Sequence, residues 1–97
     1  MNPRFFNIIN SGKPVLVDFY AEWCIPCKEV VKNLEKVKKE LREIRIVKVD
    51  VDRNPFLASH FKISSVPTIM IFKKGENLWT GTGVHSAEEI KEVLSRH

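Results

Sequence analysis

The stretch that decides the fold runs from residue 15 to residue 28 and reads VLVDFYAEWCIPCK. Its first six residues, Val15–Tyr20, are β-branched, aromatic or otherwise mostly apolar, which predicts a short strand buried on both faces. From about residue 24 to residue 42, apolar residues recur every three or four positions, which predicts a long amphipathic helix. The two cysteines of the chain, Cys24 and Cys27, therefore stand at a turn from strand to helix.

Segments on either side of this stretch continue the alternation of helix and strand. Phe5, Phe6, Ile8 and Ile9 suggest a short first helix that ends before Pro14. Residues 44–51 are β-branched and predict a second strand, parallel to the first after a right-handed crossover. Next, Asn54-Pro55 offers an N-cap followed by a proline at the first helical position, which predicts a short helix through Phe61.

The C-terminal third predicts a hairpin and a last helix. Residues 68–72 and 78–82 are strand-like and flank the turn Lys73-Lys74-Gly75-Glu76. Ser86 and Glu89 form a capping box that begins a helix whose Ile90, Val93 and Leu94 face inward. The element order is αβαβαββα, which predicts an α/β protein with a mixed sheet and helices on both of its faces.

Length and composition predict one domain of residues 1–97. Of the 97 residues, 43% are hydrophobic, which is enough for a core of its own. The longest apolar runs, of three or four residues, are far shorter than the roughly 20 residues that a membrane-spanning helix needs. Because the N-terminus also lacks the apolar region of a secretory signal, we expect a complete cytoplasmic chain.

The net charge of +4 raises the question of an anionic partner. Many of the basic residues lie between Lys28 and Arg42, where glutamates are interleaved with them at separations of three and four. This mixture is typical of a solvated, ion-paired helix face, whereas a phosphate-binding stripe carries mainly one sign. We therefore expect neither nucleic acid nor a membrane as a partner.

The spacing of Cys24 and Cys27 indicates a disulfide with a redox function rather than one that stabilises the fold. A bridge across so short a loop removes little entropy from the unfolded chain. The amide groups and dipole of a helix N-terminus stabilise a thiolate at Cys24, which becomes a nucleophile, with Cys27 within bonding reach on the same helix face. A zinc site and a pair of inert buried cysteines are the alternatives. Zinc would need two further ligands, and His60, His85 and His97 are scattered along the chain.

Asp18 is the one charged residue of the first strand. In an otherwise apolar strand that leads toward Cys24, its carboxylate should be desolvated and its pKa raised. Such a group can exchange protons near neutral pH. The alternative is a structural carboxylate with satisfied hydrogen bonds.

Motifs along nearly the whole chain resemble the thioredoxin family. They are residues 15–28, Val49-Asp50-Val51-Asp52-Arg53-Asn54-Pro55, Val66-Pro67-Thr68 and Phe72-Lys73-Lys74-Gly75. The resemblance implies a thioredoxin fold, with a central mixed sheet of four to five strands flanked by helices. It also implies that Pro67 lies beside the cysteine pair after a cis peptide bond, and the alternative is an ordinary proline of an edge strand.

The resemblance also implies roles for individual residues. Asp18 would accept the proton of Cys27 during resolution. Lys48 matches a family lysine that lies near this aspartate, and the alternative is an exposed strand lysine without a role in the reaction. Val66 would offer backbone hydrogen bonds to an extended substrate segment. The substrate-binding residues would be Trp23, Ile25, Pro26, Val66, Pro67 and Gly83. All of them except Pro67 would form an apolar rim for docking around the cysteines.

The function that follows is a protein disulfide reductase working by dithiol-disulfide exchange. We expect disulfide-containing proteins as substrates, a thioredoxin reductase as electron donor, a monomer, and no metal. We also expect no cofactor on this chain, which has no Gly-rich nucleotide loop. Two rivals remain: a thiol oxidase or disulfide isomerase, and a non-catalytic binding module. Ile25, in place of the usual glycine, and Tyr20, in place of a frequent tryptophan, leave the redox potential and the partner reductase open.

Overall fold

The structure is a computed structural model that describes residues 2–97. Its elements follow the predicted order: α1 (Pro3–Ile9), β1 (Val15–Tyr20), α2 (Ile25–Glu40), β2 (Arg45–Asp50), α3 (Pro55–His60), β3 (Thr68–Lys73), β4 (Glu76–Thr82) and α4 (Ala87–Ser95). Within these residues, no helix combines the length and the apolar character needed to cross a bilayer.

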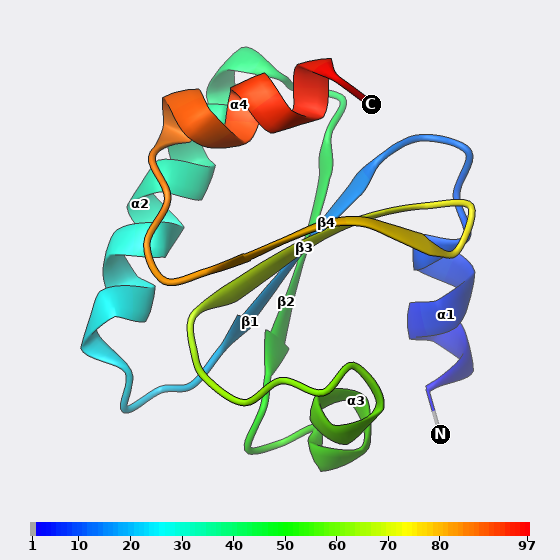
Figure 1. Cartoon of the computed structure of the whole chain (residues 1–97), viewed down its shortest axis with the longest axis vertical. Coiled ribbons are helices and arrows are strands. Elements are labelled where there is room, and N and C mark those ends of the chain that lie inside the picture. The colour runs from blue at the N-terminus through cyan, green and yellow to red at the C-terminus, as the bar shows by residue number, and fades with distance from the viewer. Residues whose placement is uncertain (1) are drawn as a thin grey trace.

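The four strands form one mixed sheet in the order β2-β1-β3-β4 (Figure 1). β1 and β2 are parallel, whereas β3 runs antiparallel to both β1 and β4. The order confirms the predicted parallel pair and the predicted hairpin. It also leaves β2 at an edge, where it has a strand on one side only. In the β1–β2 register, Asp18 lies opposite Lys48.

Alternation along β1 divides the core into two layers, because successive side chains of a strand point to opposite faces. Leu16 packs in one cluster with residues of α2 and α4, such as Val30 and Ile90. Val15, Val17 and Phe19 belong to a second cluster, on the side of α1 and α3. Figure 1 shows α2 and α4 together on one side of the sheet. Asp18, two residues after Leu16, therefore points toward the α2 side.

Several helix ends differ from the predicted ones. Cys24 is the N-cap of α2 rather than its first residue, and the helix ends at Glu40. Lys38 Nζ donates hydrogen bonds to the backbone oxygens of Arg42 and Ile44, at 2.8 and 2.6 Å. Both carbonyl groups lie beyond the last turn of the helix. These two bonds tie the helix to the loop that leads into β2.

Two predicted caps are only partly present. Asn54 occupies the N-cap position of α3, but its side chain makes no cap hydrogen bond, and Nδ2 instead donates to the Asp50 carbonyl at 2.9 Å. Ser86 caps α4 as predicted, by accepting from the Glu89 amide at 3.1 Å. The Glu89 carboxylate pairs with His85 Nδ1 at 2.9 Å.

The predicted ion pairing along α2 is wrong. Among the described residues, no lysine of this helix forms an ion pair with a glutamate of the same helix; the pair that involves α2 joins Glu40 to Lys91 of α4, at 2.8 Å. The lysines of α2 are exposed, and exposed pairs contribute little, so conformational entropy outweighs their attraction.

Candidate active site at the start of α2

The two cysteines are joined by a disulfide where the chain passes from β1 into α2. Their Cα atoms are 5.4 Å apart. The Cys24 amide closes the preceding turn by donating to the Ala21 carbonyl at 3.2 Å, and Pro26 stands within the first positions of the helix, where its fixed φ is favourable. The Cys27 amide then donates to Cys24 Sγ at 3.2 Å. When the pair is reduced, this amide and the helix dipole stabilise a thiolate on Cys24.

Both cysteines are largely shielded from solvent. Cys24 is 4% exposed and Cys27 is 3% exposed, and they pack against Ala21. A cavity of about 210 Å³ lies beside them and is also lined by Lys28, Val31 and Lys48. The disulfide therefore borders a surface recess that is lined by apolar side chains, two lysines and Glu22.

Asp18 is fully buried, and neither of its carboxylate oxygens has a hydrogen-bond partner among the described residues. Burial raises the pKa of Asp18 from 3.8 to about 6, against an opposing effect of the nearby Lys48 charge. The predicted desolvation is confirmed, and no described protein group supplies the hydrogen bonds that the alternative, a satisfied structural carboxylate, would need.

Lys48 is an exposed residue of the edge strand β2. It lies next to both the buried carboxylate of Asp18 and the cysteine recess. It pairs with Asp18 in the strand register, and its side chain lines the same cavity as Cys27. Its Nζ atom lies 5.6 Å from the centre of the Tyr20 ring. Lys48 thus acts on the charge of Asp18 and also borders the cysteine recess.

The side chains expected to form an apolar rim are placed around the cysteines. Trp23 and Ile25 are 70% and 76% exposed, and Pro26 is exposed between the cysteines. Val66 packs against the cysteine cluster and shares a second cavity, of about 120 Å³, with Trp23.

The peptide bond between Val66 and Pro67 is cis, as the resemblance implied. Pro67 is buried, and its carbonyl accepts a hydrogen bond from the Gly83 amide at 2.9 Å. Gly83 has a φ of 81°, which favours glycine at this position. The structure therefore connects Gly83 through Pro67 with the Val66 segment of the rim.

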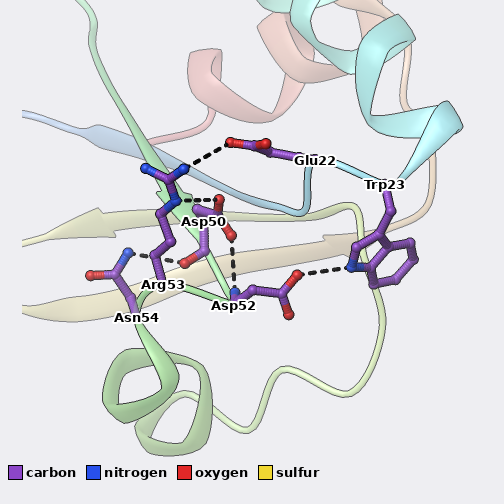
Figure 2. Close-up of polar contacts among 6 residues, drawn as sticks. All are labelled: Glu22, Trp23, Asp50, Asp52, Arg53 and Asn54. Carbon is purple, nitrogen blue, oxygen red and sulfur yellow. Dashed lines mark hydrogen bonds and ion pairs between the residues drawn. The ribbon is translucent and has the colours of Figure 1, made fainter.

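A polar network beside the cysteines was not predicted from the sequence (Figure 2). Trp23 Nε1 donates to Asp52 Oδ2 at 2.8 Å, and the Asp52 amide donates to Asp50 Oδ1 at 3.0 Å. Arg53 lies 3.5 Å from the Glu22 carboxylate and 3.7 Å from that of Asp50. The available signal was the acidic pair Asp50 and Asp52, where the second predicted strand ends. The network fixes an exposed aromatic side chain next to Cys24.

Metal-binding geometry is not found in residues 2–97, where no three or more His, Cys, Asp or Glu side chains gather as ligands. The histidines have other contacts. His60 packs between aromatic rings near Phe6 and Phe61, and His85 contacts Trp79 and Glu89. The cysteine pair thus has no additional ligands there for a zinc ion.

Comparisons with known proteins agree with this geometry. The family model described as thioredoxin matches residues 1–96. The thioredoxin of Rickettsia bellii is 37% identical over 91 residues, which cover 93% of this chain and 87% of the relative. That of Chlamydia trachomatis is 39% identical over 94 residues, which cover 97% and 91%. The X-ray structure of Fasciola hepatica thioredoxin has a TM-score of 0.85 at 32% identity, and covers 97% of this chain and 88% of its own. This chain, whose bonded Cys-x-x-Cys pair lies at the start of a helix, belongs to the thioredoxin family of disulfide oxidoreductases.

Proposed function

We propose that this chain, as one domain of residues 1–97, reduces disulfides of substrate proteins by dithiol-disulfide exchange. The observation that carries the proposal is the bonded pair itself, with Cys24 as the N-cap of α2 and Cys27 in its first turn. At this position a thiolate is favoured on Cys24, and the second sulfur is already within bonding distance.

The reaction takes place in two exchanges. In the first, the Cys24 thiolate attacks one sulfur of the substrate disulfide, a bond forms between Cys24 and the substrate, and the other substrate sulfur leaves as a thiolate. In the second, the Cys27 thiolate attacks Cys24 Sγ and the remaining substrate sulfur leaves. Two electrons pass from the dithiol to the substrate, and the protein ends with its own disulfide.

Asp18 and Lys48 act on the second exchange. Cys27 must lose its proton before it attacks, and a carboxylate with a pKa of about 6 is ionised at neutral pH and able to accept it. Lys48 favours the ionised form of Asp18 by its positive charge. Support comes from the complete burial of Asp18, whose oxygens are not already engaged with other described groups.

Substrate docking is assigned to the rim around the disulfide. Trp23, Ile25 and Pro26 offer exposed apolar surface on one side of the cysteines. Val66 offers backbone groups on the other side, in a segment that Pro67 and Gly83 hold together. An extended substrate segment can lie between the two sides, with its disulfide facing Cys24.

The partners of this reaction are disulfide-containing proteins and a thioredoxin reductase that returns electrons to Cys24 and Cys27. We place the protein in the cytoplasm, because net reduction requires a compartment in which thiols are kept reduced. We also expect it to act as a monomer. In this setting the chain transfers electrons and contributes to cell redox homeostasis.

Reduction of an insulin-like disulfide substrate, with dithiothreitol as the electron donor, tests the proposal. The wild type should accelerate the reaction, and Cys24→Ser should abolish the acceleration. Cys27→Ser is the matched variant, because it retains the nucleophile and should accumulate a mixed disulfide that mass spectrometry detects. If the wild type is inactive, or if Cys24→Ser keeps full activity, the proposal is wrong.

The direction of exchange needs a second measurement. Equilibration of the cysteine pair against a glutathione series gives its reduction potential. A potential near or below that of the cytosolic pool supports a reductase, whereas a clearly higher one indicates an oxidase or isomerase.

A further inference from the structure

Four exposed lysines form one row along the solvent side of α2: Lys28, Lys32, Lys36 and Lys39. An α-helix turns about 100° per residue, so these positions lie within about 80° of one another. The buried residues of the helix, such as Val30 and Val37, face the opposite direction. Spacings of four, four and three residues thus collect on one side the lysines that look interleaved in the linear sequence.

This lysine row is not neutralised within the described part of the chain. None of its four side chains forms an ion pair there. Glu40, which stands beside the row, is paired with Lys91 of α4. Three lysines of the row, together with Glu35, Lys38 and Arg42, line an open hollow of about 790 Å³. The surface of α2 therefore carries an unbalanced positive charge.

We propose that the lysine row binds an acidic segment of the substrate protein while the disulfide of that protein is exchanged at Cys24 and Cys27. The inference rests on the proposed function and adds a substrate class to it: proteins with several carboxylates near the disulfide. Its physical basis is charge complementarity, which accelerates encounter and fixes the orientation of two partners.

The distances fit a single interface. Lys28 directly follows Cys27 and lines the cysteine cavity, so the row begins at the disulfide itself. From Lys28 to Lys39 the helix rises by about 16 Å, which about five residues of an extended peptide can span. A typical interface of about 800 Å² per partner is about 30 Å across and can include both the rim and the row.

The row is narrow, and this favours an acidic peptide over double-stranded nucleic acid. Glu35 lies along one side of the lysines, and Glu29 lies along the other. A duplex presents phosphates over a wide surface and would meet the carboxylates on both sides of the lysine row. A single extended segment can follow the lysines and avoid the glutamates.

The experiment compares two disulfide-linked peptides that differ only in charge. In one, about six glutamates follow the cysteine, and in the other about six glutamines replace them, so that the segment can reach the end of the row. Each enzymatic kcat/KM is divided by the rate of the same peptide with dithiothreitol, which corrects for intrinsic reactivity. The ratio of the corrected values for the two peptides is the acidic preference.

Two charge-reversal variants are matched in net charge. Lys32→Glu with Lys36→Glu alters the middle of the row. Lys13→Glu with Lys74→Glu is the control, because these exposed lysines lie before β1 and in the hairpin turn, at the end of the sheet opposite the cysteines. The milder Lys32→Gln with Lys36→Gln tests the row with less risk of misfolding.

The wild type should prefer the acidic peptide about tenfold at low ionic strength, and about 0.5 M salt should remove the preference. The preference should be lost with reversal in the row, reduced with the glutamine pair, and retained in the control. Equal corrected rates on both peptides in the wild type overturn the inference and leave the proposed function intact. Failure to reduce either peptide overturns the proposed function. A third result would assign the row to nucleic acid and overturn the inference. It is the absence of a peptide preference together with salt-sensitive binding of single-stranded DNA, where Lys32→Glu with Lys36→Glu abolishes that binding.

Discussion

Asp18→Asn should stabilise the oxidised protein, and the gain should depend on pH. Asn has nearly the shape of a protonated aspartic acid, but it stays neutral at every pH. Asp18 is fully buried without hydrogen-bond partners among the described residues. Ionising it inside the fold is therefore costly, and the substitution removes only that cost.

The magnitude follows from the pKa. Burial raises the pKa of Asp18 from its ordinary 3.8 to about 6, against the effect of Lys48. This difference corresponds to about 3 kcal/mol, because a tenfold change in an equilibrium constant is about 1.4 kcal/mol. Between these two pH values the folded chain holds a proton that the unfolded chain has released. The free energy of unfolding therefore falls as the pH rises through this window, and the full cost is present above about pH 6.

Urea unfolding of the oxidised wild type and of Asp18→Asn, at a series of pH values, measures this effect. The two proteins should have nearly equal free energies of unfolding near pH 3.8, and the variant should be more stable by about 3 kcal/mol at pH 7. Glu43→Gln is the control, because Glu43 is exposed and its replacement removes no buried charge. A stability difference for Asp18→Asn that is the same at every pH would refute the reasoning.

Three further variants test the surroundings of the site. Lys48→Gln removes the charge that favours ionised Asp18, so the pKa of Asp18 should rise above about 6; carboxyl NMR titration measures it, and an unchanged pKa contradicts the assigned interaction. Asp52→Ala removes the acceptor of the hydrogen bond from the Trp23 indole. The KM for a protein substrate should rise with little change in kcat, and fluorescence anisotropy should show a more mobile indole. Asp52→Asn, which keeps an acceptor oxygen, should largely restore both properties. Lys38→Met removes two hydrogen bonds to backbone carbonyls and should lower the free energy of unfolding by about 1 kcal/mol in urea titrations; a variant as stable as the wild type would show that these bonds contribute nothing.

The fold could be predicted from the sequence because its signals are local. The apolar run at Val15–Tyr20 and the spacing of Val30, Leu34 and Val37 each identify an element without reference to the rest of the chain. The desolvation of Asp18 could also be predicted, since a strand that is apolar on both faces leaves its one carboxylate no access to water. The same holds for Cys24, whose place at a helix start follows from Pro26 and the periodicity after it.

The remaining features depend on contacts between distant or competing groups. The bond from Trp23 to Asp52 spans 29 positions and joins two loops whose proximity only the fold determines. Asn54 has the right residue type for a cap, but the Asp50 carbonyl competes successfully for its side chain. The rotation of α2 places four of its lysines on one side of the helix. This grouping is not evident from the linear sequence, in which lysines and glutamates alternate.

The position of β2 at the edge of the sheet has a consequence for self-association. An edge strand presents unpaired backbone groups to which a strand of another molecule can add, and exposed charged side chains oppose that addition. On β2 these are Arg45 and Lys48. The lysine that modulates the proton affinity of a buried carboxylate thus also carries one of the two charges that oppose such addition. Variants that make position 48 apolar should be checked by light scattering before their kinetics are interpreted.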